Sequence, residues 1–267
     1  MSIITGEKIQ RMCDLFIGTH QDFKNNPNLG EPEKWKLITS ITNVWDNPPL
    51  LFCYGHRLKD FRKILSFFGN NFILISHNSD ENITEEYLDI LQTPKLVKWY
   101  AQNVLFNHPK LNVLPIGIAN SMWAHGNINT IERVMNLNQS KIRNFYFQFT
   151  VETNRLERMK CKQALCDKGL QFDYEILNFE EYLKKLSSYK YAICPPGNGI
   201  DSHRIWECLY LGVIPVVIRS VFTEKINEKF KIILLDDWDK FDSDELIKNY
   251  TTPPTFDCKY SPSMFAE

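Results

Sequence analysis

The stretch YAICPPGNGIDSHRIWECLYLGVIPVV, from Tyr191 to Val217, decides the fold. It begins with a short apolar strand, YAICP, and then turns through PPGNG, whose glycines are expected to supply positive φ. A helix is predicted to start at an Asp201 or Ser202 N-cap and to stop at Gly212. VIPVV returns as the next strand. This order of strand, glycine turn, helix and strand is typical of an α/β fold with a parallel sheet.

The same alternation of apolar runs and helical periodicity covers most of the chain. Helix 58–68 is expected to stop at Gly69. The predicted strands are 50–54, 72–77, 97–103, 112–117, 144–149, 172–177, 191–195, 213–218 and 231–235, and the predicted helices are 58–68, 83–91, 154–166, 179–186 and 201–211.

A polar stretch, NSMWAHGNINT (120–130), interrupts the alternation and predicts a domain junction. We therefore expect two Rossmann-like domains, an acceptor-side one over 1–125 and a nucleotide-binding one over 126–250. The proline-rich tail 251–267 is expected to form an irregular strap that packs back on the first domain.

Composition excludes several classes of partner. The 31 basic and 32 acidic side chains nearly balance, so neither nucleic acid nor an anionic membrane is a default partner, and a small molecule is expected. No apolar run near the N-terminus is long enough for a signal peptide or a membrane span. The seven cysteines form no C-x-x-C pair, and the histidines show no metal-ligand spacing. Reduced thiols and no bound metal are therefore expected.

The polar residues around the PPGNG turn predict a site for a diphosphate. Backbone N–H groups at the start of a helix favour anions. Arg204 could bind the diphosphate, and Glu207, on the same helix face, could accept the ribose hydroxyls. The alternative is a solvated Arg204–Glu207 ion pair beside a structural turn. The residues expected to shape the pocket are Gly197, Asn198, Gly199, Asp201 and His203.

A second helix N-terminus follows the predicted strand 144–149. Thr153, Asn154 and Arg155 stand at its start, so Arg155 is a further candidate for the diphosphate. The alternative is an ordinary cap formed by Thr153 or Asn154, followed by a solvated arginine.

The segment PPGNGIDSHRIWECLYLGVIPVV resembles the donor-site motif of exostosin-type glycosyltransferases, family 47. Three further segments support the resemblance in matching order: ISHNSDENI (75–83), WYAQNV with LPIGIANSMWAHG (99–104 and 114–126), and FTVETNRLER (149–158). The resemblance implies a GT-B-like fold, with two Rossmann-like domains facing a cleft. It also implies an enzyme that inverts the anomeric configuration of the transferred sugar without a metal or cofactor. The chain is short for that fold and lacks the membrane stem of animal exostosins. Compact microbial or viral relatives imply a soluble protein acting in the cytoplasm, of the host if the chain is virus-encoded.

On this resemblance, the expected reaction moves a sugar from a nucleotide-sugar co-substrate to a hydroxyl of a glycan or glycoprotein acceptor. A UDP-sugar is favoured, with xylose as one candidate. Inversion needs a base, and Asp80, after the predicted strand 72–77, is the first choice. The alternative makes Asp80 or Asn82 a helix cap. His77 and Glu81 could replace Asp80 as the base, and the residues expected to contact the acceptor or sugar are His56, His77, Glu81 and Asn120.

Three other interpretations remain open. The D-x-D within DDWD (236–239) is the pattern by which another glycosyltransferase fold holds a divalent cation, although an aspartate after a strand is commonly a cap. The chain could also be a silent sugar- or nucleotide-binding scaffold of the same fold. A nicotinamide-dependent oxidoreductase is disfavoured because no G-x-G-x-x-G follows the first strand.

Overall fold

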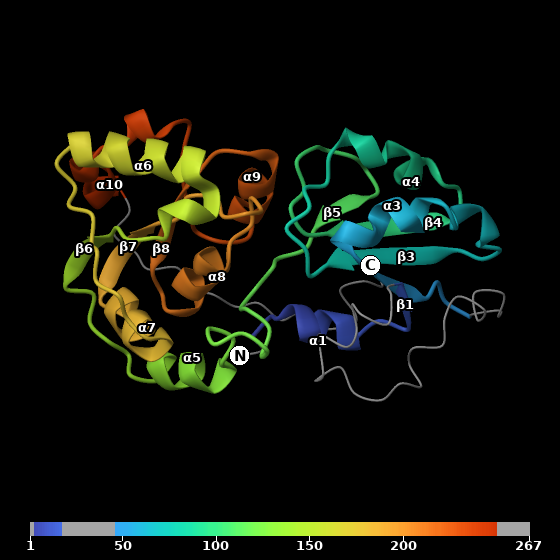
Figure 1. The fold of residues 1–267 in the computed structure, drawn as a ribbon, viewed down its shortest axis with the longest axis horizontal. Helices are drawn as coiled ribbons and strands as arrows, with labels where there is room; N and C mark the ends of the chain where they lie inside the picture. Colours follow the sequence, from blue (N-terminus) through green and yellow to red (C-terminus); the bar gives the residue numbers. More distant parts are fainter. Residues whose placement is uncertain (1–2, 18–45, 250–267) are drawn as a thin grey trace. The chain divides into compact units, whose positions relative to one another are not determined.

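The computed structural model describes residues 3–17 and 46–249. These residues divide after Met122 into two compact units, each of which carries one parallel sheet (Figure 1). The division falls inside the polar stretch 120–130. The tail 251–267, for which a strap was expected, lies outside the described residues, as does Cys258.

The first unit contains a sheet whose described strands run in the order β1-β2-β3-β4-β5, all parallel. Two strands have the predicted bounds, and the next two lie within a few residues of theirs. The short strand β1 was not predicted, because three residues carry too little pattern. The strands are β1 Leu15–Ile17, β2 Leu50–Tyr54, β3 Phe72–His77, β4 Leu96–Ala101 and β5 Leu111–Val113.

Helices α3 and α4 cover one face of this sheet, and α1 lies against the other (Figure 1). The α-helices are α1 Gly6–Arg11, α3 Leu58–Arg62 and α4 Leu88–Gln92, and the 3₁₀ turns are η4 Gly55–Arg57, η5 Leu65–Phe67 and η6 Glu85–Tyr87.

The prediction of one continuous helix over 58–68 is wrong. The α-helix ends at Arg62, and the chain then turns so that the Phe68 ring packs 4.7 Å from Phe72 and 5.7 Å from Phe61. Burial of this aromatic cluster outweighs the local preference to continue the helix. Gly69 is not a left-handed helix stop, because the described glycines with positive φ are Gly117, Gly169 and Gly212.

The second unit holds four described strands in the order β6-β7-β8-β9, again all parallel. They are β6 Arg143–Tyr146, β7 Tyr189–Ile193, β8 Ile214–Ile218 and β9 Ile233–Leu235. In neither unit do the described strands show the reversal of order that marks the switch point of a doubly wound sheet. The position of a site must therefore be argued from its side chains.

The predicted strand 172–177 is wrong. This segment runs beside the end of β6, where the Asp173 amide donates to the Phe147 carbonyl (2.9 Å), but it forms no ladder. Its Tyr174 and Ile176 side chains are 73% and 96% exposed. The apolar alternation therefore buries too little surface here to hold a strand in the sheet.

Helices α6 and α10 enclose the core on one face of the second sheet, while α5, α7 and α8 pack together on the other (Figure 1). Three of these six helices were not predicted: α5, α9 and α10. Helix α5 begins after the N-cap Asn127, inside the stretch expected to be a junction. The helices are α5 Ile128–Met135, α6 Arg155–Asp167, α7 Phe179–Ser187, α8 His203–Tyr210, α9 Val221–Asn227 and α10 Ser243–Asn249. No helix within 3–17 and 46–249 is both long and apolar enough to cross a bilayer.

Candidate functional site

The loop between β7 and α8 carries the polar residues that the sequence singled out. Cys194 extends the ladder by donating its amide to Val216 (2.9 Å), and the Gly197 amide donates to the Gly199 carbonyl (3.0 Å). The expected positive φ at these two glycines is absent. Gly212 does end α8 as predicted, with φ +65°.

Ser202 is the N-cap residue of α8, but its side chain makes no capping hydrogen bond. Its Oγ is buried and has no hydrogen-bond partner. A buried hydroxyl without a partner is costly, and the first-turn amides of a helix also seek acceptors. The Ser202 hydroxyl at the start of α8 is therefore available to donate to an anion.

Two guanidinium groups lie beside this loop. Arg158, from α6, donates to the Pro196 carbonyl (2.9 Å) and to the Thr150 carbonyl (2.7 Å). Arg204, from α8, donates to the Gln148 carbonyl and lies 5.5 Å and 5.2 Å from the ring centres of Tyr146 and Tyr182. Within the described chain, neither forms an ion pair with a carboxylate.

The two charges affect each other. Burial lowers the pKa of the Arg158 guanidinium to about 10, and the positive charge of Arg204 acts in the same direction. An anion placed between them would offset both effects, because it would favour the charged form of each arginine. The geometry thus provides a partly desolvated, positively charged site at the carboxyl end of β7.

The N-terminus of α6 meets the same loop. The Asn154 side chain donates to the Gly197 carbonyl (2.9 Å) rather than capping its own helix. Thr153 and Arg155 are exposed, and the Arg155 side chain forms no ion pair or hydrogen bond with any described residue. The structure therefore brings the two predicted helix N-termini together through Asn154.

Two residues expected to contact a ligand have protein partners instead. The Glu207 carboxylate is buried and accepts a hydrogen bond from the Tyr182 hydroxyl (2.6 Å). Asp201 is also buried and accepts from the Trp206 indole (2.7 Å). The prediction of one polar face shared by Arg204 and Glu207 needs correction, because α7 covers the position of Glu207. The alternative, a solvated Arg204–Glu207 ion pair, is also not observed, because Glu207 is buried and bonded to Tyr182.

In the first unit, a partly buried hydrogen-bond network lies at the carboxyl end of the sheet. His77 is buried, with Nε2 2.9 Å from the Pro115 carbonyl and Nδ1 3.1 Å from the Asn78 side-chain oxygen. Asn120 donates to the same Asn78 oxygen (3.1 Å) and accepts from the Glu7 amide (3.0 Å). His77 and Asn120 are thus brought together, and both contact the Asn78 side chain at the carboxyl edge of the sheet.

The other candidates of this unit lie nearer the surface. Asp80 is exposed, and the N-cap of the following 3₁₀ turn is Thr84, so the capping alternative for Asp80 is not observed. Glu81 accepts from the Tyr87 hydroxyl (3.1 Å). The exposed His56 ring lies 5.5 Å from Tyr54.

Some site residues escaped the sequence analysis. Arg158 stands three residues after Arg155 on the same helix, and this spacing could have indicated it. Glu7 accepts from both the amide (3.0 Å) and the hydroxyl (2.9 Å) of Ser121, a pairing over 114 positions for which no local signal exists. Gln102 is buried, and neither atom of its amide has a hydrogen-bond partner.

Two aspartates of the DDWD segment are engaged with cations. Asp237, the first aspartate of the D-x-D, pairs with Lys160 (2.5 Å), and Asp236, which precedes the D-x-D, pairs with Arg219 (2.6 Å). Asp237 is also the N-cap of the 3₁₀ turn η8 Trp238–Lys240, which confirms the capping alternative for this residue. The described part of the chain contains no group of three or more His, Cys, Asp or Glu side chains placed to hold a metal.

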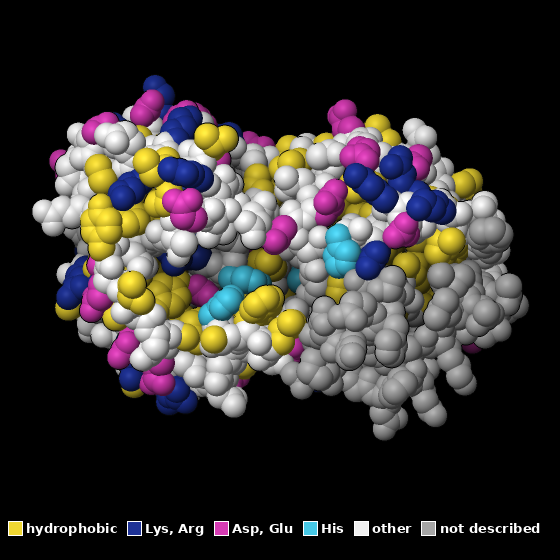
Figure 2. Space-filling view, viewed as in Figure 1, with side chains coloured by type: hydrophobic (Ala, Val, Ile, Leu, Met, Phe, Trp, Pro, Cys, Tyr) yellow, Lys and Arg dark blue, Asp and Glu magenta, His cyan; other side chains and the backbone are white. Residues whose placement is uncertain are grey.

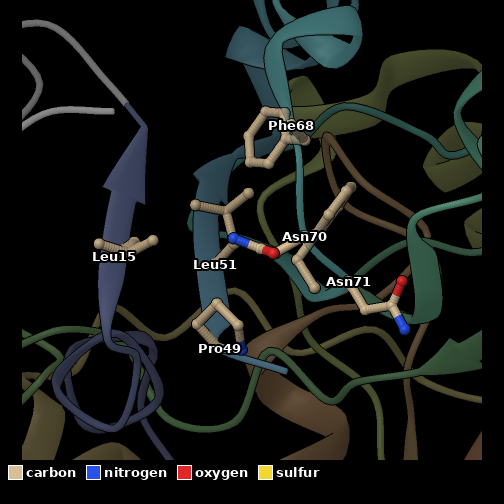
Figure 3. A pocket seen from close by; sticks show the side chains of 7 residues that line it. Leu15, Pro49, Leu51, Phe68, Asn70 and Asn71 are labelled. Atoms are coloured by element: carbon tan, nitrogen blue, oxygen red, sulfur yellow. The ribbon is translucent and has the colours of Figure 1, made fainter. Parts of the chain in front are cut away.

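A small pocket lies at the opposite end of the first sheet. Leu15, Pro49, Leu51 and Phe68 border it, near the amino ends of β1 and β2 (Figure 3). Its volume of about 10 Å³ is close to that of one water molecule. The pocket is therefore too small to be a ligand site.

No protein-family model matches this sequence, and no characterised protein matches it either.

Proposed function

We propose that this protein is an inverting glycosyltransferase that takes its sugar from a nucleoside diphosphate. The donor would be a UDP-sugar, with UDP-xylose as a candidate, and the acceptor a hydroxyl of a glycan or glycoprotein. The observation that carries the proposal is the pair Arg158 and Arg204, two guanidinium groups beside the loop 194–202 with carbonyl but no carboxylate partners in the described chain.

A partly buried guanidinium without a carboxylate partner favours an anionic ligand, and this site retains two such groups. A diphosphate can accept several hydrogen bonds, and arginine can bind it in a bidentate manner. The buried Ser202 hydroxyl would supply a further donor. Arg155 would add a third positive charge from the start of α6.

The step from diphosphate binding to sugar transfer rests on the resemblance of residues 191–217 to exostosin-type enzymes. The proposal includes the GT-B architecture of that family, with the donor bound by the second unit and the acceptor mainly by the first. No metal is required, because the arginines would stabilise the charge that develops on the departing diphosphate.

We assign the remaining residues proposed roles. Asp80 is the base, since its carboxylate is exposed after β3, and Glu81 and His56 contact the acceptor or sugar. Thr153, Asn198 and His203 line the donor site, and Asn154 holds Gly197 in place. Glu207 and Asp201 act indirectly. Glu207 orients Tyr182 beneath Arg204, and Asp201 anchors Trp206 of the same helix.

The test is calorimetric titration with UDP and GDP, followed by assays of UDP release from UDP-sugars. Arg204→Gln and Arg158→Gln should each weaken UDP binding by tenfold or more, because a hydrogen bond to a charged group contributes about 1.5–3 kcal/mol. Arg219→Gln is the matched control, since Arg219 lies on the same unit with Glu224 and Asp236 as partners.

Asp80→Asn should abolish turnover and leave UDP binding unchanged. Absence of nucleotide binding to the wild-type protein, or wild-type affinity in both arginine variants with circular dichroism confirming that they fold, would refute the donor site. UDP binding without turnover on any sugar donor would instead favour the silent scaffold.

A further inference from the structure

A cluster of exposed and half-buried rings lies in the second unit, at the first turn of α8. It consists of Trp123, His125, Phe179 and His203, which we call the aromatic platform. The His125 ring lies 6.2 Å from Trp123, 6.5 Å from Phe179 and 6.1 Å from His203. Figure 2 shows histidine side chains at the surface beside hydrophobic ones, close to where Figure 1 draws α8.

Trp123 is unusually accessible for its size. It is 54% exposed, whereas Trp99, Trp206 and Trp238 are fully buried. The Trp123 and His125 rings are nearly parallel, at 22°. Large apolar side chains left accessible in a polar loop commonly mark a binding surface.

The platform adjoins the arginine site. Phe179 lies 6.3 Å from Tyr182, and Tyr182 lies 5.2 Å from the Arg204 guanidinium. In the sequence, His203 lies between Arg204 and Ser202, whose hydroxyl has no hydrogen-bond partner. A ligand whose diphosphate reaches Arg204 would therefore place a neighbouring group over these rings.

We propose that the aromatic platform stacks against the base of the nucleoside diphosphate, an inference that rests on the proposed function. A nucleobase is flat and has an aromatic face, which suits stacking on Trp123 and His125. A sugar would instead require hydrogen-bond acceptors. The carboxylates near the platform are already used, Glu207 by Tyr182 and Glu180 by Arg133.

Calorimetry with UDP and with inorganic pyrophosphate separates the two parts of the site. Trp123→Ala should weaken UDP binding about 5- to 150-fold, the range expected for one stacked base, and leave pyrophosphate binding within about twofold. His125→Ala should act in the same direction. Trp123→Phe should retain most of the affinity, because it keeps an aromatic face.

Tyr174→Ala is the matched control, since Tyr174 is 73% exposed on the same unit and lies outside the platform. It should bind UDP like the wild type. UDP should also quench tryptophan fluorescence in the wild type, and this quenching should be reduced in Trp123→Phe.

Wild-type UDP affinity in both Trp123→Ala and His125→Ala would refute base stacking on the aromatic platform but would not refute the arginine site. Equal weakening of UDP and pyrophosphate in Trp123→Ala would also refute base stacking, because the ring would then act through the anion site. If the wild-type protein bound neither probe, the proposed function would fall together with the platform.

Discussion

Substitution of Gly117 tests how closely Ile4, which precedes α1, approaches the chain at Gly117. Its φ is +68°, and a methyl group there would lie 2.4 Å from the Ile4 carbonyl oxygen. That oxygen accepts the Ile118 amide at 2.8 Å, next to the bridge between Thr5 and Ile118. Gly117→Ala must therefore strain the backbone and also displace this hydrogen bond.

The expected loss of unfolding free energy is the sum of two effects. A left-handed conformation costs a non-glycine residue about 1–2 kcal/mol, and loss of the hydrogen bond adds about 1 kcal/mol. Two other glycines separate these effects. Gly169 has φ +85° and no atom within 4 Å of the added methyl group, so Gly169→Ala should cost only the strain. Gly69 has neither feature, so Gly69→Ala should be neutral or slightly stabilising.

Urea unfolding followed by circular dichroism would compare the three variants under identical conditions. The predicted order of destabilisation is Gly117→Ala, then Gly169→Ala, then Gly69→Ala. If Gly117→Ala were no more destabilising than Gly169→Ala, the close approach of Ile4 to Gly117 would be refuted. A destabilising Gly69→Ala would show that the local backbone needs glycine there for a reason that the structure does not contain.

Two further predictions concern the second unit. Asp201→Ala removes the carboxylate that accepts from the buried Trp206 N–H at 2.7 Å and should cost about 1–3 kcal/mol in urea unfolding. Asp201→Asn retains an acceptor oxygen, so an equal loss in both variants would contradict this account. Glu180 pairs with Arg133 and Lys184, and these hydrogen bonds lower its pKa to about 2 from an ordinary 4.5, so the pairing stabilises the fold fully above about pH 4.5 and is lost as the pH falls through about 2. Urea unfolding of Glu180→Gln should therefore differ from the wild type at pH 6 and converge with it toward pH 2, whereas a gap independent of pH would contradict the ion pairs.

The strands were predictable where burial is complete on both faces. β3 is buried at all six positions, and its apolar run has the same bounds in the sequence and in the structure. The segment 172–177 carries a similar pattern, but its outward residues meet solvent. A single sequence shows which residues alternate and not whether another element covers them.

Sequence spacing identified the helix that carries the donor candidates but not the surroundings of each side chain. Arg204 and Glu207 do lie on one helix, α8, as predicted, but they do not form the shared polar face that their spacing indicated. The spacing could not reveal that the Tyr182 hydroxyl, from α7, donates a hydrogen bond to the Glu207 carboxylate. The network of the first unit was equally hidden, since Glu7 meets Asn120 and Ser121 only in the folded chain.

Helix α1 depends on partners more than a hundred residues downstream. It has six residues, and its Glu7 is held by Asn120 and Ser121. A helix this short is unstable alone in water. During translation, α1 is therefore expected to stay unfolded until Asn120 and Ser121 have been synthesised. Helix α1 is synthesised before the residues that hold it, and nascent chains arrested before Asn120 would expose Ile3, Ile4 and Ile9, which the finished fold buries.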